Sequence, residues 1–140
     1  METLQQLSRR QVDALRAIAS AETTDRGAAL NAIALALRVR PPSALGHLTP
    51  LESRGLVVRY RGKSRLTAKG RSTLVEYQRH HRIAERLFSG IGLPPEAVCA
   101  AAKEVDLAIS HRTIERLCAA EQHPRECPHG EPIAPCAKDE

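Results

Sequence analysis

Hydrophobic residues recur at helical spacing in the first part of the chain. Val12, Leu15 and Ile18 lie three residues apart, so they fall on one side of a helix over residues 9–23. A similar pattern of leucine and isoleucine predicts a second, shorter helix over residues 29–39. Two short helices therefore open the chain.

A third helix is expected over residues 41–55, PPSALGHLTPLESRG. The two prolines suit its first turn, where a missing N–H costs little, and Gly55 suits its end. Gly46 and Pro50 lie inside it, and an internal proline removes a backbone hydrogen bond at a cost of around 3 kcal/mol. We therefore expect this helix to be kinked or to end early.

The next segment, GLVVRYRGKSRL, changes to β-branched residues. A polar turn at Arg61-Gly62-Lys63-Ser64 and a short return through Leu66 predict a small β-hairpin. Three helices followed by a hairpin, with Arg and Lys on the third helix and the hairpin, are typical of a winged helix-turn-helix. In that arrangement the third helix lies in the DNA major groove and the hairpin reaches the phosphates beside it.

The second part of the chain returns to helical patterns. A long helix begins at Ala68 and is closed by the turn GLPP at residues 92–95. A further helix is expected over residues 96–109, and Ser110 is placed to cap the start of a last one. The tail from Gln122 contains too many prolines to continue as a helix.

Charge is distributed unevenly between the two parts. Residues 1–82 hold 15 Lys and Arg against 6 Asp and Glu, whereas residues 83–140 hold 6 against 10. A basic first part suits a polyanionic partner such as double-stranded DNA. The candidate DNA contacts on the third helix and the hairpin are Arg40, Ser43, His47, Arg59, Arg61, Lys63 and Arg65.

The apolar composition argues against a membrane protein. No apolar run approaches the roughly 20 residues that span a bilayer, and the first residues, METLQQLSRRQ, lack the apolar stretch of a signal peptide. We therefore expect a cytoplasmic protein with no membrane partner.

Four cysteines, Cys99, Cys118, Cys127 and Cys136, all lie in the last third of the chain. In a reducing cytoplasm such a group is typical of metal binding or redox chemistry rather than of structural disulfides. The four thiolates are enough for a zinc or iron–sulfur site, and His123 or His129 could replace one of them.

Three stretches resemble the diphtheria-toxin-repressor and manganese-transport-repressor family of metal-dependent transcriptional regulators. They are LESRGLVVRYRGKSRLTAKGR, RHHRIAERLFSGIGLPPEAV and LAISHRTIERL. The tail HPRECPHGEPI is also similar to a family tail that reads close to CPHG-x-PIP. The similarity covers nearly the whole chain.

This resemblance implies a mainly α fold with a small β-hairpin. Residues 1–72 would form a winged helix-turn-helix, and residues 73–140 a linking helix with a helical metal-binding and dimerisation domain and a tail rich in Cys and Pro. It also implies a homodimer that binds a palindromic operator, with iron or manganese favouring the DNA-binding form and no catalytic residues. The chain stops too early for the barrel-like domain that many relatives carry next.

The family's metal ligands carry over only in part. His81 and Glu85 match a His and a Glu four residues apart, which share one helical face. Cys99 stands where the family has a second His, and a thiolate shifts preference toward zinc or ferrous iron. In the family's second site, Asp13 and Asp106 keep oxygen ligands.

Lys103 and Leu107 replace metal-binding side chains of that second site. We therefore expect the second site not to bind metal, because an ammonium group repels a cation. The favoured hypothesis is a metal-responsive repressor. The alternative is a winged-helix regulator that senses redox, zinc or iron–sulfur status through Cys99, Cys118, Cys127, His129 and Cys136. An enzyme using Cys127 and His129 is disfavoured because no carboxylate orients the pair.

Overall fold

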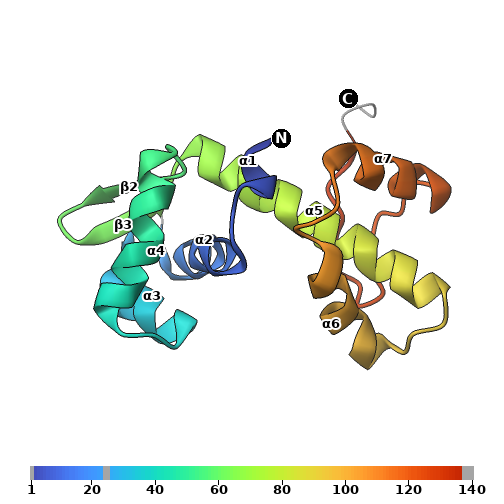
Figure 1. Ribbon diagram of the computed structural model, residues 1–140, viewed down its shortest axis with the longest axis horizontal. Helices are drawn as coiled ribbons and strands as arrows, with labels where there is room; N and C mark the ends of the chain where they lie inside the picture. The colour runs from blue at the N-terminus through green and yellow to red at the C-terminus, as the bar shows by residue number, and fades with distance from the viewer. Residues whose placement is uncertain (1, 24–25, 137–140) are drawn as a thin grey trace. The chain divides into compact units, whose positions relative to one another are not determined.

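The computed structural model describes residues 2–23 and 26–136, and it is mainly helical with one small antiparallel sheet (Figure 1). The predicted fold class is confirmed. The elements are α1 (Glu2–Gln5), α2 (Arg9–Ala21), β1 (Ala28–Ala29), α3 (Leu30–Leu37), α4 (Pro41–Ser53), β2 (Val57–Tyr60), β3 (Lys63–Leu66), α5 (Ala68–Gly90), α6 (Pro95–Val105) and α7 (His111–Ala120). The last four residues of the predicted tail, 137–140, lie outside the described residues.

The chain divides into two compact units. Leu7–Leu74 form the first, and Met1–Gln6 with Val75–Glu140 form the second. Helix α5 begins in the first unit and continues into the second. Within the described residues, no helix is both long enough and apolar enough to cross a membrane.

The core of the first unit lies between α2, α3 and α4. The predicted apolar side of α2 is buried, with Val12, Leu15 and Ile18 fully enclosed. Ser8 caps this helix in a reciprocal capping box with Gln11, which satisfies two backbone N–H groups at the helix start. The sequence pattern therefore located this helix because packing and capping agree.

Helix α4 does not end early, so that part of the expectation was wrong, whereas the kink stays a prediction. It runs through Pro50 to Ser53, and Gly55 follows with a left-handed φ of 73°. The proline ring approaches the carbonyl four residues earlier, which belongs to Gly46, and Gly46 has open space around its α-carbon. Near the proline, Thr49 Oγ1 donates a hydrogen bond to the Leu45 carbonyl oxygen at 3.0 Å.

The hairpin of β2 and β3 is tighter than predicted. Its turn consists of Arg61 and Gly62 alone, both with positive φ (49° and 73°), and Lys63 already pairs with Tyr60. Positive φ at both central residues matches the right-handed twist of the flanking strands. The two-residue strand β1, which the sequence pattern did not predict, joins the outer edge of β3.

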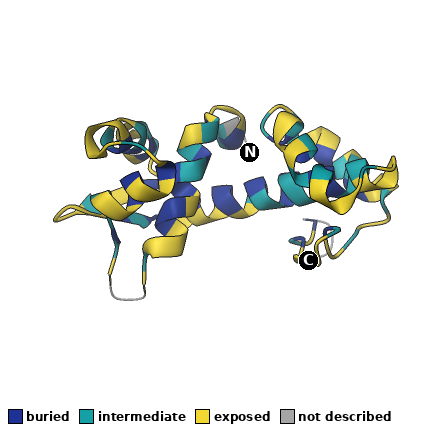
Figure 2. Cartoon of the chain, turned by 90° about the horizontal axis from the view of Figure 1, so that it is seen from below, coloured by how far each residue is buried: buried dark blue, intermediate teal, exposed yellow. Residues whose placement is uncertain are grey.

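The second unit is built from α1, the C-terminal part of α5, α6, α7 and the tail. One apolar cluster joins Ile83 of α5, Ile114 and Cys118 of α7, and Ile133 and Cys136 of the tail. Buried positions recur along α5, the longest helix of the chain, in Figure 2. As predicted, Ser110 caps α7 through the Thr113 N–H, but α6 ends earlier than expected, at Val105.

Candidate metal centre and nucleic-acid interface

His81 and Glu85 lie one turn apart on α5 and face the same side. His81 Nε2 is 3.3 Å from Glu85 Oε1, and Cys99 Sγ from α6 is 3.7 Å from the same ring nitrogen. Glu85 is buried and the other two are partly buried. The structure therefore brings the three residues predicted as ligands together, with one donor atom from each available to a single ion.

Asp106 lies behind His81 and not among these donor atoms. Its carboxylate is fully buried and accepts hydrogen bonds from Tyr77 Oη and His81 Nδ1, both at 2.9 Å. Because a carboxylate only accepts, Nδ1 donates to Asp106, and this leaves Nε2 as the ring nitrogen that faces Glu85 and Cys99, where its lone pair would be available to a bound ion. Carboxylates commonly orient metal-binding histidines in this way.

The tail supplies two more donors to the other side of Glu85. His129 Nδ1 lies 2.8 Å from Glu85 Oε2, and Cys127 belongs to the same group of potential ligands. Glu85 Oε2 is buried and makes no hydrogen bond of good geometry with the described residues. We call His81, Glu85, Cys99, Cys127 and His129 the Glu85 cluster.

A tight turn in the tail sets the positions of Cys127 and His129. The Gly130 N–H donates to the Cys127 carbonyl at 2.9 Å, and Gly130 has a φ of 83°, which glycine adopts without strain. His129 Nε2 lies 2.9 Å from the Pro95 carbonyl oxygen at the start of α6. The CPHG stretch is therefore both a packed turn and a source of donor atoms.

The residues of the second predicted site belong to both units. Asp13 lies on α2 in the first unit, 4.0 Å from the Arg16 guanidinium. Lys103 on α6 has an exposed side chain, and Leu107 is half-buried just after that helix. Ligation by Asp13 and Asp106 stays a prediction.

The four cysteines do not come together. Cys99 and Cys127 belong to the Glu85 cluster, whereas Cys118 and Cys136 meet each other at 3.6 Å between their sulfur atoms. A single site made by all four, as in the iron–sulfur alternative, therefore has no support in the structure. The turn at residues 127–130 carries Cys127 to Glu85, while the chain beyond it brings Cys136 to α7.

The sequence pattern did not identify a group formed by Glu76, His80 and His111. His80 Nε2 and His111 Nδ1 each lie 3.6 Å from Glu76 Oε1. His80 is buried, and burial, with His111 and Arg79 nearby, lowers its pKa from 6.5 to about 4, so it is uncharged at neutral pH. Its position one residue before His81 gave no indication of a separate environment.

The predicted DNA contacts lie on α4 and the hairpin of the first unit. Arg40 precedes α4 as its N-cap, and Ser43 and His47 lie one turn apart on that helix. Arg61 and Lys63 are exposed at the hairpin tip. Arg59 and Arg65 are half-buried on the two strands, with Arg59 3.9 Å from Glu52.

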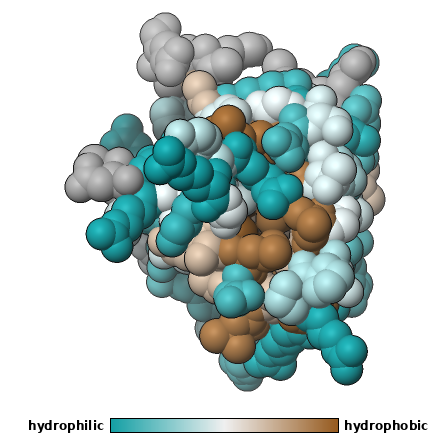
Figure 3. All heavy atoms as spheres, turned by 90° about the vertical axis from the view of Figure 1, so that its left-hand side faces the viewer, coloured by the Kyte–Doolittle hydropathy of each residue, from teal (hydrophilic) through white to brown (hydrophobic). Residues whose placement is uncertain are grey.

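A basic hollow accompanies the hairpin. It is lined by Arg26, Gly27, Val58, Tyr60, Arg61, Lys63 and Arg65 and has a volume of about 380 Å³. Tyr60 is 71% exposed, and the Arg61 guanidinium lies 5.2 Å from the centre of its ring. Figure 3 shows an apolar patch bordered by hydrophilic side chains on one face of the molecule. Cations around an exposed ring are suited to a nucleic-acid backbone.

Comparisons with known proteins agree with this arrangement. Residues 67–135 match the family described as iron dependent repressor, metal binding and dimerisation domain. The chain is 30% identical to a hypothetical protein from Sulfolobus solfataricus, with a TM-score of 0.85 over 91% of this chain and 99% of that one. The comparison with curated proteins found no match.

Two further solved structures carry a functional description. A manganese-dependent transcriptional repressor in complex with manganese is 29% identical, with a TM-score of 0.74 over 91% of this chain and 59% of that one. IdeR of T. acidophilum is 27% identical, with a TM-score of 0.68 over 94% of this chain and 64% of that one. The chain thus spans about three fifths of these two proteins. It belongs to the diphtheria-toxin-repressor and manganese-transport-repressor family of metal-dependent transcriptional regulators.

Proposed function

We propose that the protein is a cytoplasmic repressor that binds operator DNA as a homodimer when a divalent metal occupies the Glu85 cluster. The observation that carries this proposal is the meeting of donor atoms from α5, α6 and the tail around one buried carboxylate. An ion bound by these donor atoms would link α5, α6 and the tail to one another.

The donor atoms of the Glu85 cluster suit a transition metal. Glu85 Oε2 is buried and makes no hydrogen bond with the described residues, although His129 Nδ1 is 2.8 Å away. A buried carboxylate is unfavourable unless a cation or a proton compensates its charge. The donor atoms of the Glu85 cluster therefore fit the divalent metal ion that membership of this family implies.

The mixture of donors indicates which metal fits best. Two thiols and two imidazoles surround one carboxylate, and such nitrogen and sulfur donors favour ferrous iron or zinc over manganese, which prefers oxygen. We therefore propose ferrous iron as the physiological ion. Manganese, which the solved relative binds, is the competing candidate.

The chain's own residues prepare the site. Asp106 holds the His81 ring so that Nε2 faces Glu85 and Cys99, and the turn at residues 127–130 directs the tail donors to the same carboxylate. When bound, the ion supplies the positive charge that balances the carboxylate and thiolates. Each ligand is thus placed by its own element.

The DNA-binding part of the proposal concerns the first unit. Exposed Arg61 and Lys63 at the hairpin tip are placed to contact phosphates, and Ser43 and His47 to contact the major groove from α4. A homodimer would present two such units to half-sites about 34 Å apart on the DNA. The match to a metal binding and dimerisation domain supports this assembly.

A DNA-binding measurement tests the proposal. Purified protein is used to select DNA sequences from a random pool under anaerobic conditions with ferrous ion, and the affinity of the selected duplex is then measured with ferrous ion, manganous ion or chelator. We expect at least a tenfold tighter complex with ferrous ion, as is typical of allosteric coupling of about 1–3 kcal/mol. Glu85→Gln should remove this difference.

Glu104→Gln is the matched control, because Glu104 is exposed on α6 outside the cluster. It should keep the response to ferrous ion. An unchanged response in Glu85→Gln, or DNA binding that ignores both metals, would overturn the proposal.

A further inference from the structure

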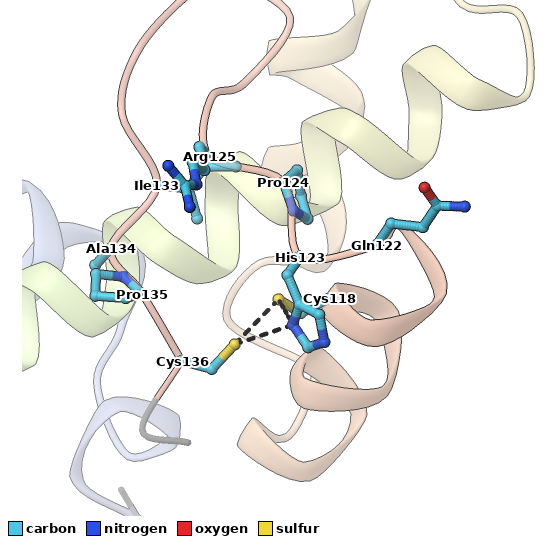
Figure 4. A pocket seen from close by; sticks show the side chains of 9 residues that line it. All are labelled: Cys118, Gln122, His123, Pro124, Arg125, Ile133, Ala134, Pro135 and Cys136. Atoms are coloured by element: carbon cyan, nitrogen blue, oxygen red, sulfur yellow. Dashed lines mark hydrogen bonds between the residues drawn. The ribbon is translucent and has the colours of Figure 1, made fainter. Parts of the chain in front are cut away.

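A second group of soft metal ligands lies where the tail passes the end of α7, and we call it the Cys118 cluster (Figure 4). Cys118 Sγ is 3.6 Å from Cys136 Sγ and 3.5 Å from His123 Nδ1. His123 Nδ1 is in turn 3.2 Å from Cys136 Sγ. The three donor atoms therefore form a small, nearly equilateral triangle.

The surroundings combine burial with access. Both thiols are 4% exposed or less, whereas His123 is exposed. The three side chains line one cavity of about 620 Å³, which Gln122, Arg125 and the tail prolines complete. The imidazole therefore lies on the exposed side of the cavity, and the two sulfur atoms lie on its buried side.

An unusual backbone directs His123 toward the sulfur atoms. Gln122 and His123 both adopt the left-handed region, with φ of 60° and 53°, and the His123 N–H donates to the Cys118 carbonyl at 2.8 Å. Two successive non-glycine residues in this region are uncommon, and such backbone is often kept where function requires it. Here it folds His123 back over the last turn of α7.

A metal ion that binds here must displace the proton of a buried thiol. Burial, followed by the contact with Cys136, raises the pKa of the Cys118 thiol. A buried thiolate is unfavourable without a positive charge nearby, and a bound divalent metal supplies that charge and releases the thiol proton.

We propose that Cys118, His123 and Cys136 bind a thiolate-preferring divalent ion, best matched by zinc. A tetrahedral zinc ion, with Zn–S of about 2.3 Å and Zn–N of about 2.0 Å, separates its donor atoms by about 3.5–3.8 Å. The three distances in the Cys118 cluster are within a few tenths of an ångström of these values. A water molecule would complete the fourth position.

This ion would fasten the tail to α7. Cys118 lies in the helix and His123 just after it, whereas Cys136 ends the described part of the tail. The segment closed by the ion contains Cys127 and His129, which belong to the Glu85 cluster. The Cys118 cluster thus holds the segment that supplies ligands to the proposed regulatory metal.

A disulfide between Cys118 and Cys136 is the competing explanation for the two close sulfur atoms. The structure does not join Cys118 and Cys136 by a disulfide. A disulfide requires only the sulfur atoms, whereas a metal site also uses the imidazole. The role of His123 therefore separates the two explanations.

The test uses the full chain with Cys99→Ser and Cys127→Ser, so that Cys118 and Cys136 are its only thiols. The reduced protein is titrated anaerobically with cobaltous ion as a spectroscopic probe and then with zinc. We expect one equivalent of cobalt to give thiolate-to-cobalt charge-transfer absorption with the visible bands of a tetrahedral ion, and zinc to displace it. Because the Glu85 cluster has lost both thiols, this absorption reports the Cys118 cluster alone.

Two exposed neighbours provide the variant and its control. His123→Asn removes the imidazole but keeps a residue that tolerates the left-handed backbone, and it should weaken cobalt binding by at least the roughly 10–100-fold that outer-shell changes alone produce. Gln122→Asn, at the adjacent left-handed position, should leave binding unchanged. Unaltered binding in His123→Asn, no charge-transfer absorption with two titratable thiols, or a Cys118–Cys136 disulfide that persists in reductant would each overturn the proposal.

Discussion

At the scale of single residues, Asp106 shows how one buried carboxylate can orient a candidate metal ligand. Its position in the sequence pointed to ligation, because the family has an oxygen ligand there. The structure places it 2.9 Å from His81 Nδ1 and from Tyr77 Oη, and within the second unit it lies in none of the potential ligand groups of the described residues, so its ligation stays a prediction. The side chain that shares a helix face with His81 could be predicted, but the one behind its ring could not.

We predict that Asp106→Asn weakens binding of ferrous ion to the Glu85 cluster by roughly 10–100-fold, the usual loss when an orienting partner of a metal ligand is changed. The amide of an asparagine can donate to Nδ1, and the ring proton then moves to Nε2. Nε2, which lies beside Glu85, would no longer offer a lone pair to the ion. Calorimetric titration under anaerobic conditions measures the affinity. Glu104→Gln is the control, because Glu104 is an exposed residue of α6 two positions before Asp106 and lies outside the cluster. This variant should bind ferrous ion normally.

His123 marks the limit of prediction from the sequence at this scale. The sequence identifies Cys118 and Cys136 as candidate ligands. It does not indicate the left-handed backbone of Gln122 and His123, because neither of these two residues is a glycine. Which cysteines meet depends on where the tail turns, and Gly130 gives only a local indication of that turn. The grouping of the cysteines is therefore a property of tertiary structure.

At the scale of elements, the helices were predictable where apolar spacing and capping agree, as in α2 and α7. The two shortest elements, α1 and β1, were not predicted, because elements of four and two residues are too short to show a periodic pattern of hydrophobic residues. For α4 the internal proline led us to expect a possible early end, but the helix continues to Ser53. Packing of Leu48 and Leu51, both fully buried, holds its last turns in place.

Two glycines on helices should respond to alanine in opposite ways. A β-carbon at Gly46 on α4 meets nothing within 4 Å, so Gly46→Ala should stabilise the protein by about 0.5–1 kcal/mol through helix propensity. A β-carbon at Gly70 on α5 would lie 2.0 Å from the Leu56 carbonyl oxygen, so Gly70→Ala should destabilise it by about 1–3 kcal/mol through overpacking. Urea unfolding measures both. Equal signs for the two variants would contradict this account of the packing.

The hairpin allows a prediction about DNA binding that does not depend on the metal. Arg61 and Lys63 are exposed at its tip, and each phosphate contact contributes about 0.9 to the slope of log affinity against log salt concentration. Because the proposed homodimer carries two hairpins, replacing either residue by alanine should reduce the magnitude of that slope by about 1.8, twice the value for one contact, and weaken binding to all sequences alike. Arg116→Ala, exposed on α7, serves as the control in fluorescence anisotropy. A loss confined to one operator sequence would assign these residues to base recognition instead.

At the scale of the whole molecule, chemistry is segregated between the two units. The basic hollow and the hairpin belong to residues 7–74, and both thiol-containing clusters belong to the second unit. Only α5 is shared, and it carries His81 and Glu85 in the second unit. The uneven charge of the sequence parallels this separation, because the basic first part of the chain contains the proposed DNA contacts.

This segregation predicts where metal changes stability when no DNA is present. At a free ferrous ion concentration 100 times the dissociation constant, mass action should stabilise the elements around the Glu85 cluster by about 2.7 kcal/mol. Hydrogen exchange should therefore show increased protection in α6 and in the part of α5 around His81 and Glu85, with α2, α3 and α4 nearly unchanged. Glu85→Gln should abolish the increase, whereas Glu104→Gln should retain it. An equal rise in protection in both units would mean that the metal acts on the folding of the whole chain and not through the Glu85 cluster.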